Sequence, residues 1–395
     1  MSLNLSRRRF MGGAAAALGY LGLRPGADLL AQGPDPLARP PAPVFPHQAN
    51  EYDAFAKLSS NENPYGPSEK MLESMNGVWK YSNRYGYPDG DIREMIAEHH
   101  GVEPENILLG AGSGETLQVA GHAFLEHDKK VVGVTPTFRT VYRTATNIDA
   151  DVIELPLDED YSQNIDLMIE TTRRNYRDVG MVYLCNPNNP TGMIVPASDV
   201  RRLLDGIPED VPVLIDEAYH HFIEDPRYET SVPYVLEGRN VLVTRTFSKI
   251  YGMAGMRLGY GIAPVDLIQQ MRPYSTGSMN ALVKWGGVAA LQDAESEAWV
   301  KKTTLDLRKK TVGEIEAMGY ECLPSECNFF MVKTGRPVRE IQPAFRERGV
   351  LVGRPFPPMN DFLRVSIGTE DEMKRFMTAW KDIFPVNAAT GASGG

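Results

Sequence analysis

Residues 240–257 read Asn-Val-Leu-Val-Thr-Arg-Thr-Phe-Ser-Lys-Ile-Tyr-Gly-Met-Ala-Gly-Met-Arg. The run from Asn240 to Val243 is apolar and β-branched, which is typical of a buried strand in a parallel sheet. Lys249 lies just beyond the carboxyl end of this strand, and a second apolar run begins at Leu258. A lysine at the mouth of a buried strand loses solvation, which lowers its pKa and makes its amine a better nucleophile.

Groups that bind anions lie close to Lys249 in the sequence. Thr246 and Ser248 supply hydroxyls, and Arg257 supplies a guanidinium group further on. An amine nucleophile beside a site for an anion of phosphate size indicates a carbonyl cofactor that carries a phosphate, namely pyridoxal phosphate. The alternative is a solvated loop lysine, which is the commoner state of a single lysine.

Three more predicted strands lead to residues that could serve a ligand. These strands are 131–134, 181–185 and 213–215. The residues that follow them are Phe138, Asn189, Asp216 and Tyr219. Helical segments alternate with the strands, which predicts an α/β fold with a mostly parallel sheet and with ligands beyond the carboxyl ends of its strands. Phe138 either stacks on a flat cofactor there or packs into the core.

A glycine-rich loop with Gly112 and Ser113 follows a short predicted strand and precedes a predicted helix at 115–125. Strand, loop and helix N-terminus together present backbone N–H groups and the positive end of the helix dipole to a phosphate. A dinucleotide site has a similar pattern, but it needs an acid about twenty residues further on. Lys129 and Lys130 occupy that window instead, so a dehydrogenase is the less favoured interpretation.

The C-terminal part of the chain predicts a smaller α+β domain. A long amphipathic helix is expected at 296–318, where Gly319 provides its end. The elements that follow are strands 328–332, 350–352 and 362–367 and helices 338–348 and 371–383. Arg364 lies within an otherwise apolar strand and needs an anionic partner. That partner is either a structural carboxylate or a ligand.

Composition excludes several classes of function. The net charge of −10 and the pI of about 5.3 argue against nucleic acid or an anionic membrane surface as a partner. Three cysteines are too few for a disulfide framework or a zinc site. Cys322 and Cys327 either pair in an exported protein or remain thiols. His99-His100 and His220-His221 are adjacent pairs, whose members cannot share one face of a helix or strand. His220 and His221 either support Tyr219 from behind or lie in solvent.

The N-terminus resembles an export signal. Residues 6–11 contain three consecutive arginines, and the Ala/Gly/Leu-rich stretch 12–23 follows them. This stretch is too short and too weakly apolar for a membrane anchor. We therefore expect a twin-arginine signal peptide at 1–31 and a proline-rich linker at 32–48, with a basic tail and a core helix as the alternative. Recognition by the twin-arginine export machinery and a periplasmic or other extracytoplasmic location would follow.

The motifs together resemble the fold-type I pyridoxal-phosphate aminotransferases of class I/II. The motifs that carry this resemblance are Asn-Pro-Thr-Gly at 189–192, Asp216-x-x-Tyr219, Ser248-Lys249, Arg257 and Arg364. Three further segments are similar to the histidinol-phosphate aminotransferase branch: 61–67, 87–89 and 362–369. The resemblance covers roughly residues 45–385, and the motif set is more specific for the cofactor than for the substrate.

The resemblance implies a large domain at 76–285, with a central, mostly parallel, seven-stranded sheet flanked by helices. It also implies an α+β small domain at 286–386, an arm at 49–75 that contributes to the small domain and the active site, and a tail at 387–395. The implied enzyme is a homodimeric transaminase of amino-acid metabolism. It would transfer an amino group between an amino acid, or a histidinol phosphate-like amine, and a 2-oxo acid by a ping-pong mechanism.

The resemblance also implies the role of each residue toward the cofactor. Lys249 would form the Schiff base and move the proton, Asp216 would pair with the pyridine nitrogen, and Tyr219 and Asn189 would bind the 3′-oxygen. Phe138 would stack on the ring. The residues expected to hold the phosphate are Gly112, Ser113, Thr246, Ser248 and Arg257, with Tyr87 reaching the cofactor of the other subunit.

The substrate residues implied by the resemblance are Tyr65, Asn189, Arg354 and Arg364. Arg364 would form a bidentate pair of hydrogen bonds with a substrate carboxylate or phosphate. The sequence departs from the branch at 353–358, where Arg354 has a proline-rich setting. Because histidinol phosphate is a cytoplasmic intermediate, our hypothesis is an exported aminotransferase that acts on an ordinary or specialised amino acid. The alternatives are a decarboxylase or lyase on the same fold and, less favoured, a non-catalytic binding protein.

Overall fold

The structure is a computed structural model that describes residues 51–125 and 128–384. The expected signal peptide at 1–31, the linker at 32–48 and the tail at 387–395 lie outside the described residues. Within the part of the chain that is described, no helix combines the length and apolar character that a membrane crossing requires.

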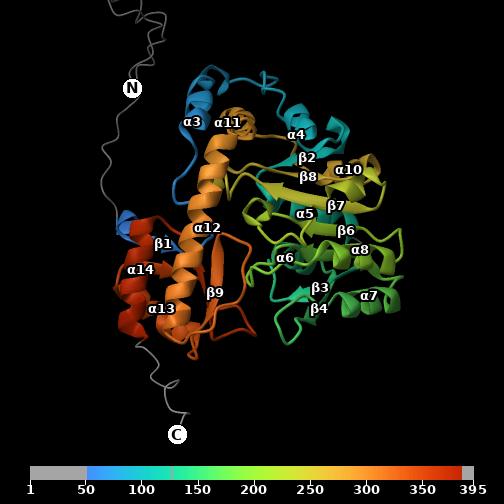
Figure 1. Cartoon of the computed structure of the whole chain (residues 1–395). Helices are drawn as coiled ribbons and strands as arrows, with labels where there is room; N and C mark the ends of the chain where they lie inside the picture. The colour runs from blue at the N-terminus through green and yellow to red at the C-terminus, as the bar shows by residue number, and fades with distance from the viewer. Residues whose placement is uncertain (1–50, 126–127, 385–395) are drawn as a thin grey trace, which may run out of the picture. The chain divides into compact units, whose positions relative to one another are not determined.

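A seven-stranded sheet forms the centre of the larger lobe, in the order β2-β8-β7-β6-β5-β3-β4 (Figure 1). Strands β3 to β7 pair in parallel, whereas β8 is antiparallel to both β7 and β2. The prediction of a mostly parallel sheet is therefore confirmed. The strands are β2 (Ile107–Gly110), β3 (Lys130–Thr135), β4 (Asp151–Pro156), β5 (Val179–Cys185), β6 (Val213–Asp216), β7 (Val241–Thr246) and β8 (Gly259–Ile262).

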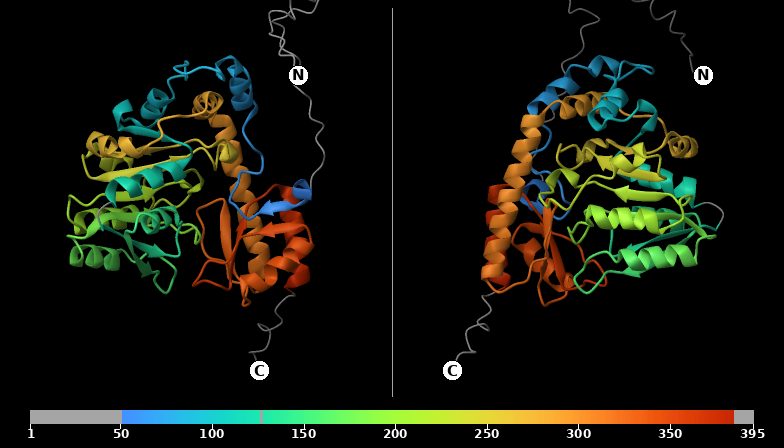
Figure 2. Two further views of the ribbon diagram at one scale, coloured as in Figure 1. Left: turned by 180° about the vertical axis from the view of Figure 1, so that it is seen from behind. Right: turned by 45° about the vertical axis from the view of Figure 1, so that its right-hand side comes forward.

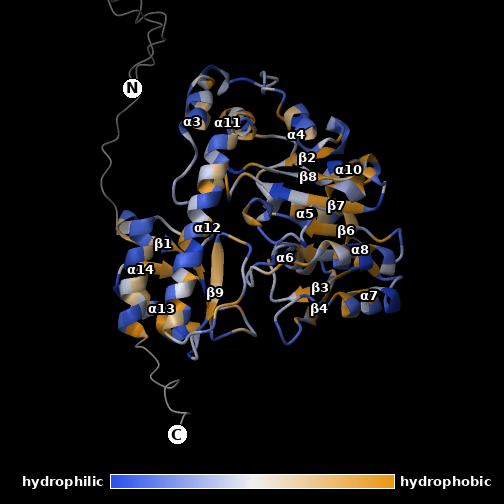
Figure 3. Cartoon of the chain, in the orientation of Figure 1, coloured by the Kyte–Doolittle hydropathy of each residue, from blue (hydrophilic) through white to orange (hydrophobic). Residues whose placement is uncertain are grey.

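Both faces of this sheet are covered, and its strands are accordingly apolar. In β7, Val241 and Val243 join one hydrophobic core while Leu242 joins a second core on the other face, because successive side chains of a strand point to opposite faces. Figure 3 shows the middle strands of the sheet as hydrophobic and most of the surrounding helices as mixed. Continuous apolar strands of this kind are what a parallel sheet between helices requires.

The helices of the larger lobe lie on both sides of the sheet (Figure 2). They are α3 (Glu69–Asn76), α4 (Ile92–His100), α5 (Ser113–Phe124), α6 (Thr140–Asn147), α7 (Ile165–Arg174), α8 (Ala197–Gly206), α9 (Val232–Leu236), α10 (Val265–Met271) and α11 (Ala281–Leu291). Helix α5 begins directly after β2 and the glycine-rich loop, so its N-terminus lies at the end of the sheet where β7 finishes and the antiparallel β8 begins.

The smaller lobe is built around the long helix α12 (Ala294–Ala317), which runs from α11 down to this lobe (Figures 1 and 2). Strands β9 (Phe329–Lys333) and β11 (Phe362–Ser366) pair in antiparallel fashion. Helices α13 (Val338–Glu347) and α14 (Glu370–Ile383) complete the lobe. Its core contains aromatic side chains of α13 and α14, among them Phe345, Phe376 and Trp380.

An N-terminal arm joins the two lobes. Strand β1 (Ala56–Leu58) pairs in parallel with β10 (Val350–Val352), and Ala56 and Leu58 are buried in the smaller core. The arm then passes the carboxyl end of the central sheet before it reaches α3. The arm therefore places its residues 59–63 beside the strand ends that the sequence marked as a ligand site.

Candidate active site

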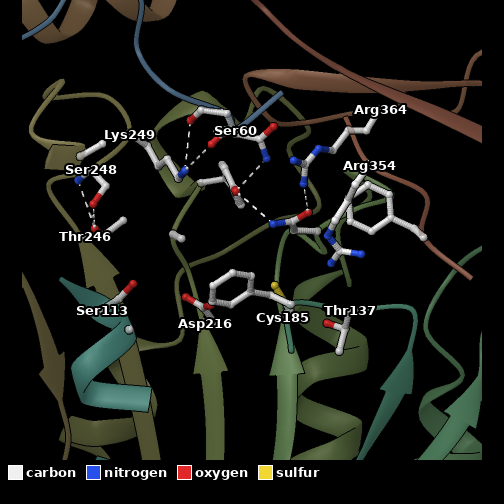
Figure 4. A pocket seen from close by; sticks show the side chains of 18 of the residues that line it. Ser60, Ser113, Thr137, Cys185, Asp216, Thr246, Ser248, Lys249, Arg354 and Arg364 are labelled. Atoms are coloured by element: carbon white, nitrogen blue, oxygen red, sulfur yellow. Dashed lines mark hydrogen bonds between the residues drawn. The ribbon is translucent and has the colours of Figure 1, made fainter. Parts of the chain in front are cut away.

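A cavity of about 310 Å³ lies at the carboxyl ends of β5, β6 and β7 (Figure 4). This volume is in the range of small-molecule sites. The loop before α5, the arm and β11 complete its walls. Residues expected from the sequence that line this cavity are Ser113, Phe138, Asn189, Asp216, Tyr219, Thr246, Ser248, Lys249, Arg257, Arg354 and Arg364.

Lys249 follows β7 and points its amine toward the arm (Figure 4). Its Nζ donates to the carbonyl oxygens of Asn61, at 3.1 Å, and Ser60, at 3.4 Å. Burial, together with the positive charge of Arg364, lowers the pKa of Lys249 to about 8. A substantial share of this amine is therefore neutral near pH 8, which a nucleophile requires.

Asp216 ends β6 and is 2% exposed. Strand register places it opposite Thr244 of β7, whose hydroxyl donates to Asp216 Oδ1 at 3.0 Å. Burial raises the pKa of Asp216 to about 6, although the Thr244 hydroxyl and the charge of Lys249 act in the other direction. A protonated ring nitrogen placed beside this carboxylate would favour its ionised form.

Tyr219 lies just past β6 and is 3% exposed. Its hydroxyl oxygen accepts hydrogen bonds from the side-chain amides of Asn61, at 3.0 Å, and Asn189, at 3.3 Å. Burial raises the pKa of Tyr219 well above its ordinary value, so the phenol keeps its proton at neutral pH and can donate it in a hydrogen bond.

The hydroxyls and the guanidinium group after β7 form a polar cradle. Thr246 Oγ1 donates to Ser248 Oγ at 2.8 Å, and Arg257 Nη1 contacts the same Ser248 oxygen at 3.4 Å. Arg257 Nη2 donates to the carbonyl oxygen of Ala111 at 3.0 Å. The cradle therefore joins the turn after β7 to the loop before α5.

Two glycines allow the loop before α5 to lie very close to Arg257 and to the start of β8. Gly112 has φ +78°, and a Cβ built on it would lie 2.1 Å from Arg257 Nη2. A Cβ on Gly259 would lie 2.2 Å from the backbone nitrogen of Ser113. Only glycine fits at both positions, so the helix N-terminus and the guanidinium group of Arg257 converge on one spot. Backbone N–H groups, a helix dipole and a cation there suit a phosphate.

Arg364 of β11 is 7% exposed and forms no ion pair among the described residues. Its Nη1 donates to Asn189 Oδ1 and its Nη2 to the carbonyl oxygen of Ser59, each at 2.6 Å, whereas Nε has no partner in the described structure. Burial lowers its pKa to about 10. No carboxylate of the described residues pairs with Arg364, so this buried cation faces a cavity suited to an anionic ligand.

Arg354 lines the same cavity from the segment before β11. Its guanidinium carbon lies 4.3 Å from the centre of the Phe356 ring, and that of Arg364 lies 4.8 Å from it. Burial and the neighbouring cations Arg143 and Arg139 lower the pKa of Arg354. The proline-rich setting thus brings Arg354 to the side of the cavity that holds Arg364.

The comparison with protein families decides which class of protein has this site. Residues 54–379 match the model of the family "Aminotransferase class I and II". The chain belongs to this family. It is a pyridoxal-phosphate-dependent aminotransferase, and its relatives include the "Histidinol-phosphate aminotransferase 2" of Carboxydothermus hydrogenoformans. That protein is 35% identical over 339 residues, which cover 84% of this chain and 91% of the relative.

Solved structures of similar proteins agree with this assignment. The histidinol-phosphate aminotransferase from Sinorhizobium meliloti in complex with pyridoxal-5′-phosphate superimposes with a TM-score of 0.77 at 25% identity, over 84% of this chain and 91% of that chain. The L-threonine-O-3-phosphate decarboxylase from Porphyromonas gingivalis has a TM-score of 0.70 at 21% identity, over 83% of this chain and 98% of that chain. The second likeness concerns the fold alone, so the fold by itself does not select the reaction.

The donor set of this aminotransferase fits pyridoxal phosphate. An amine, a buried acid and a phenol face one cavity, and the glycine at position 112 lets the Arg257 guanidinium group lie close to the loop before α5. Among the described residues, no group of three or more His, Cys, Asp or Glu side chains is placed to hold a metal ion.

Three expected site residues, Gly112, Tyr65 and Tyr87, do not line this cavity. Gly112 lies in the loop before α5, close against Arg257. The Tyr65 ring packs edge-on against Trp299, with 4.7 Å between ring centres. The Tyr87 hydroxyl donates to the carbonyl oxygen of Met279 at 2.6 Å, in a separate hollow of the surface. The expected role of Tyr87 toward another subunit stays a prediction.

The structure also adds residues that the sequence did not single out. Asn61, Thr244 and Phe356 each contact an expected site residue. Asn61 and Phe356 lie in the segments 61–67 and 353–358, which were compared with the histidinol-phosphate aminotransferase branch, but neither residue was given a role. Their partners are distant in the chain or adjacent on a neighbouring strand, so no local pattern reveals them.

The sequence left alternatives open for two cysteines and two histidines. Cys322 and Cys327 are free thiols, so they do not pair. The expectation of solvent-exposed His220 and His221 is wrong, because both rings are half-buried, with 3.6 Å between their centres. Burial lowers the pKa of both histidines. His220 Nδ1 lies 3.0 Å from the carbonyl oxygen of Glu217, and the His221 ring packs edge-on against Tyr251.

Proposed function

We propose that this aminotransferase takes its amino group from a primary amine that carries an anionic group and passes it to a 2-oxo acid. The observation that carries this proposal is Arg364. A buried guanidinium group without a carboxylate partner among the described residues faces the cavity of Lys249. Arg354 adds a second cation on the same side. A carboxylate or phosphate of the substrate would compensate these charges.

The cofactor supplies an electron sink for the substrate carbanion once it is bound. In our proposal Lys249 carries it covalently, Asp216 pairs with its ring nitrogen, and Tyr219 and Asn189 hold its 3′-oxygen. Phe138 covers its ring. The phosphate would be held by Gly112, Ser113, Thr246, Ser248 and Arg257, which form the cradle described above.

Lys249 would also be the base that moves the proton at the substrate α-carbon. With a pKa of about 8, the free amine can both take up and release a proton near neutral pH, as a general base must. The carbonyl oxygens of Ser60 and Asn61 accept hydrogen bonds from the Lys249 amine, and these bonds would position the amine between the proton transfers. The amino group would be transferred in two half-reactions, so we expect ping-pong kinetics.

Two donor classes fit the pair of arginines. The names of the curated relatives favour histidinol phosphate. The arginine-rich N-terminus favours an amino acid met outside the cytoplasm, and this is the donor that we propose. Purified holoenzyme should show its highest kcat/KM with an amino acid in a panel that includes histidinol phosphate. A strong and exclusive preference for histidinol phosphate would refute the proposal.

The same assay separates transamination from the decarboxylase and lyase alternatives. Each turnover should yield one keto acid from the donor and one new amino acid from the acceptor. Release of carbon dioxide or ammonia at the rate of donor consumption would contradict this. Borohydride reduction of the holoenzyme should add a pyridoxyl mass to the peptide that contains Lys249, and Lys249→Ala should lose both the mass and the turnover.

We further propose export and dimerisation. The arginines at positions 7–9 and the stretch 12–23 support a twin-arginine signal and an extracytoplasmic location. The full-length chain should be recovered outside the cytoplasm, and Arg8→Lys combined with Arg9→Lys should retain it inside; equal distribution of both chains would oppose export. The position of Tyr87 outside its own cavity supports a homodimer in which Tyr87 serves the partner's cofactor.

A further inference from the structure

Asn61 connects the N-terminal arm to the groups at the centre of the cavity. It is 1% exposed and lines the cavity. Its carbonyl oxygen accepts from Lys249 Nζ at 3.1 Å, and its side-chain Nδ2 donates to Tyr219 Oη at 3.0 Å. Figure 4 shows the amine of Lys249 turned to this part of the arm, beside Ser60. One arm residue thus touches two of the groups that carry the proposed chemistry.

Neighbouring side chains fix the orientation of Asn61. Ser366 Oγ donates to Asn61 Oδ1 at 2.9 Å, while the Asn61 backbone N–H donates to Ser366 Oγ at 2.8 Å. Because a hydroxyl hydrogen occupies Oδ1, the amide N–H group is the part that faces Tyr219. Asn328 Nδ2 donates to the Asn61 carbonyl oxygen at 3.1 Å and fixes the backbone as well.

These contacts determine what the Tyr219 hydroxyl can do. A phenol oxygen can accept through its lone pairs and can donate its single hydrogen. In this structure Asn61 and Asn189 both donate to Tyr219 Oη. The hydroxyl hydrogen of Tyr219 is therefore free to be donated to a third partner. Tyr219 lines the cavity, so a ligand bound there can be that acceptor.

We propose that Asn61 is a positioning residue, which keeps Tyr219 as a hydrogen-bond donor toward the 3′-oxygen of the cofactor and holds the Lys249 amine at its resting place. This inference rests on the roles given to Tyr219 and Lys249 in the proposed function. If Asn189 were the only donor to Tyr219 Oη, one lone pair of the phenol oxygen would lack a partner. The O–H group could then rotate, so that its hydrogen would no longer face the cofactor.

The residue type at position 61 agrees with this role. Its φ of +55° is in the left-handed region, which asparagine, aspartate and glycine adopt most readily. Only asparagine among these three also supplies an N–H donor at its tip. Aspartate would keep the shape and lose the donor, and glycine would keep the backbone and lose the side chain.

The charges around Asn61 come from several elements. Asp216 of β6, Arg364 of β11 and Glu62 of the arm face Lys249, and the thiols of Cys185 and Cys327 lie near Tyr219. All of them remain in an Asn61 variant. Asn61→Gly adds no charge, so a change in the titration of that holoenzyme can be assigned to the hydrogen bond that the substitution removes, whereas the new carboxylate of Asn61→Asp would itself raise the midpoint.

The experiment titrates the visible absorbance of the holoenzyme against pH. A donor on the 3′-oxygen stabilises the form that has lost its proton. Without Asn61 the donor is lost, so the proton is held more tightly and the midpoint should rise by about 1 pH unit, a tenfold change. We expect this rise in both Asn61→Asp and Asn61→Gly, together with a lower kcat and a nearly unchanged KM.

Asn63→Asp is the matched control. Asn63 lies on the same arm, its Nδ2 donates to the carbonyl oxygen of Ile250 at 2.8 Å, and no contact links it to Tyr219. The control should loosen the arm, as judged by thermal melting, and leave the midpoint where it is in the parent enzyme.

An unchanged midpoint in Asn61→Gly, or an equal rise in Asn63→Asp, would overturn the inference. If Asn61→Gly fails to bind the cofactor, Asn61→Ala is the deciding variant, because it also removes the amide and adds no charge. The proposed function has its own test in the parent enzyme, so turnover there with unchanged midpoints in both Asn61 variants would refute only this inference.

Discussion

At the scale of single residues, burial shifts the ionisation of two groups of opposite charge in the candidate site. It lowers the pKa of Lys249 to about 8 and raises that of Asp216 to about 6. Each shift disfavours the charged form of the group in the cofactor-free protein. The site therefore costs stability until a ligand provides compensating charge, which is a common trade at active sites.

Replacement of Asp216 by asparagine should stabilise the cofactor-free protein at neutral pH. The folded-state pKa of about 6 exceeds the ordinary value of 3.8, so the folded protein holds this proton more tightly than the unfolded chain. Stability then falls as pH rises from about 4 to about 6, and above this range the loss is roughly 3 kcal/mol. Asp216→Asn should melt several degrees higher than the parent at pH 7.5, with the gain vanishing near pH 4.

The control for this prediction is Asp266→Asn, which removes an exposed acid from the first turn of α10. It should show no such gain. With cofactor present the order should reverse, since Asp216→Asn loses the partner of the ring nitrogen. A cofactor-free Asp216→Asn protein that melts below the parent at pH 7.5 would contradict the argument.

At the scale of elements, the phosphate cradle depends on how closely the loop before α5 meets the turn after β7. Gly112 and Arg257 both have positive φ values, +78° and +63°. This geometry turns the helix N-terminus and the guanidinium group toward the same point. Sequence alone identified the glycine loop and the arginine, and the structure supplies the close contact between them.

Gly112→Ala should raise the dissociation constant of the cofactor at least about tenfold, or about 1.4 kcal/mol. The new methyl group would displace Arg257, because its Cβ position is 2.1 Å from Arg257 Nη2. Gly101→Ala is the control: Gly101 also has a positive φ, +65°, but nothing lies within 4 Å of its Cβ position. The control should cost about 1 kcal/mol of stability and leave cofactor affinity unchanged; equal affinity losses in both variants would refute the argument.

Elements whose sequence shows a clear period could be predicted well. The helix expected at 338–348 is found as α13, Val338–Glu347, and the strand expected at 350–352 is found as β10. Helix α11 was not predicted, because it is apolar nearly all round and shows no amphipathic period. Strand β4 was not predicted either, since most of its residues at the sheet edge are partly or fully exposed.

The site was predictable where its residues follow a strand end. Lys249, Asp216 and Tyr219 belong to this group, because parallel strands bring their carboxyl ends to one edge. Asn61 was not predictable, since its partner Ser366 lies 305 positions away and the contact requires the packed smaller lobe. Whether each residue acts as proposed is a matter for the experiments above.

At the scale of the whole molecule, the proposed homodimer gives Tyr87 its function. Tyr87 is half-buried outside the cavity of its own chain, and its hydroxyl would donate to the phosphate of the partner's cofactor. Sedimentation of the holoenzyme should give the mass of a dimer. Loss of one hydrogen bond to a charged group in Tyr87→Phe should weaken cofactor binding roughly tenfold.

Mixed dimers test whether that hydroxyl acts across the interface. A Tyr87→Phe chain paired with a Lys249→Ala chain contains one site with an intact Lys249 and an intact Tyr87 from its partner. Such mixtures should regain parental activity per intact Lys249 at limiting cofactor. No gain over Tyr87→Phe alone would show that Tyr87 serves its own chain.

The pairing of β1 with β10 has a consequence for biosynthesis. The first strand described, Ala56–Leu58, cannot pair with its partner strand until Val350–Val352 has been synthesised. The hydrogen bonds between Asn61 and Ser366 can form only later still. Domains otherwise tend to fold in the order of synthesis. In this enzyme the central sheet can assemble early, but the lysine-bearing pocket is closed only after translation has passed residue 366.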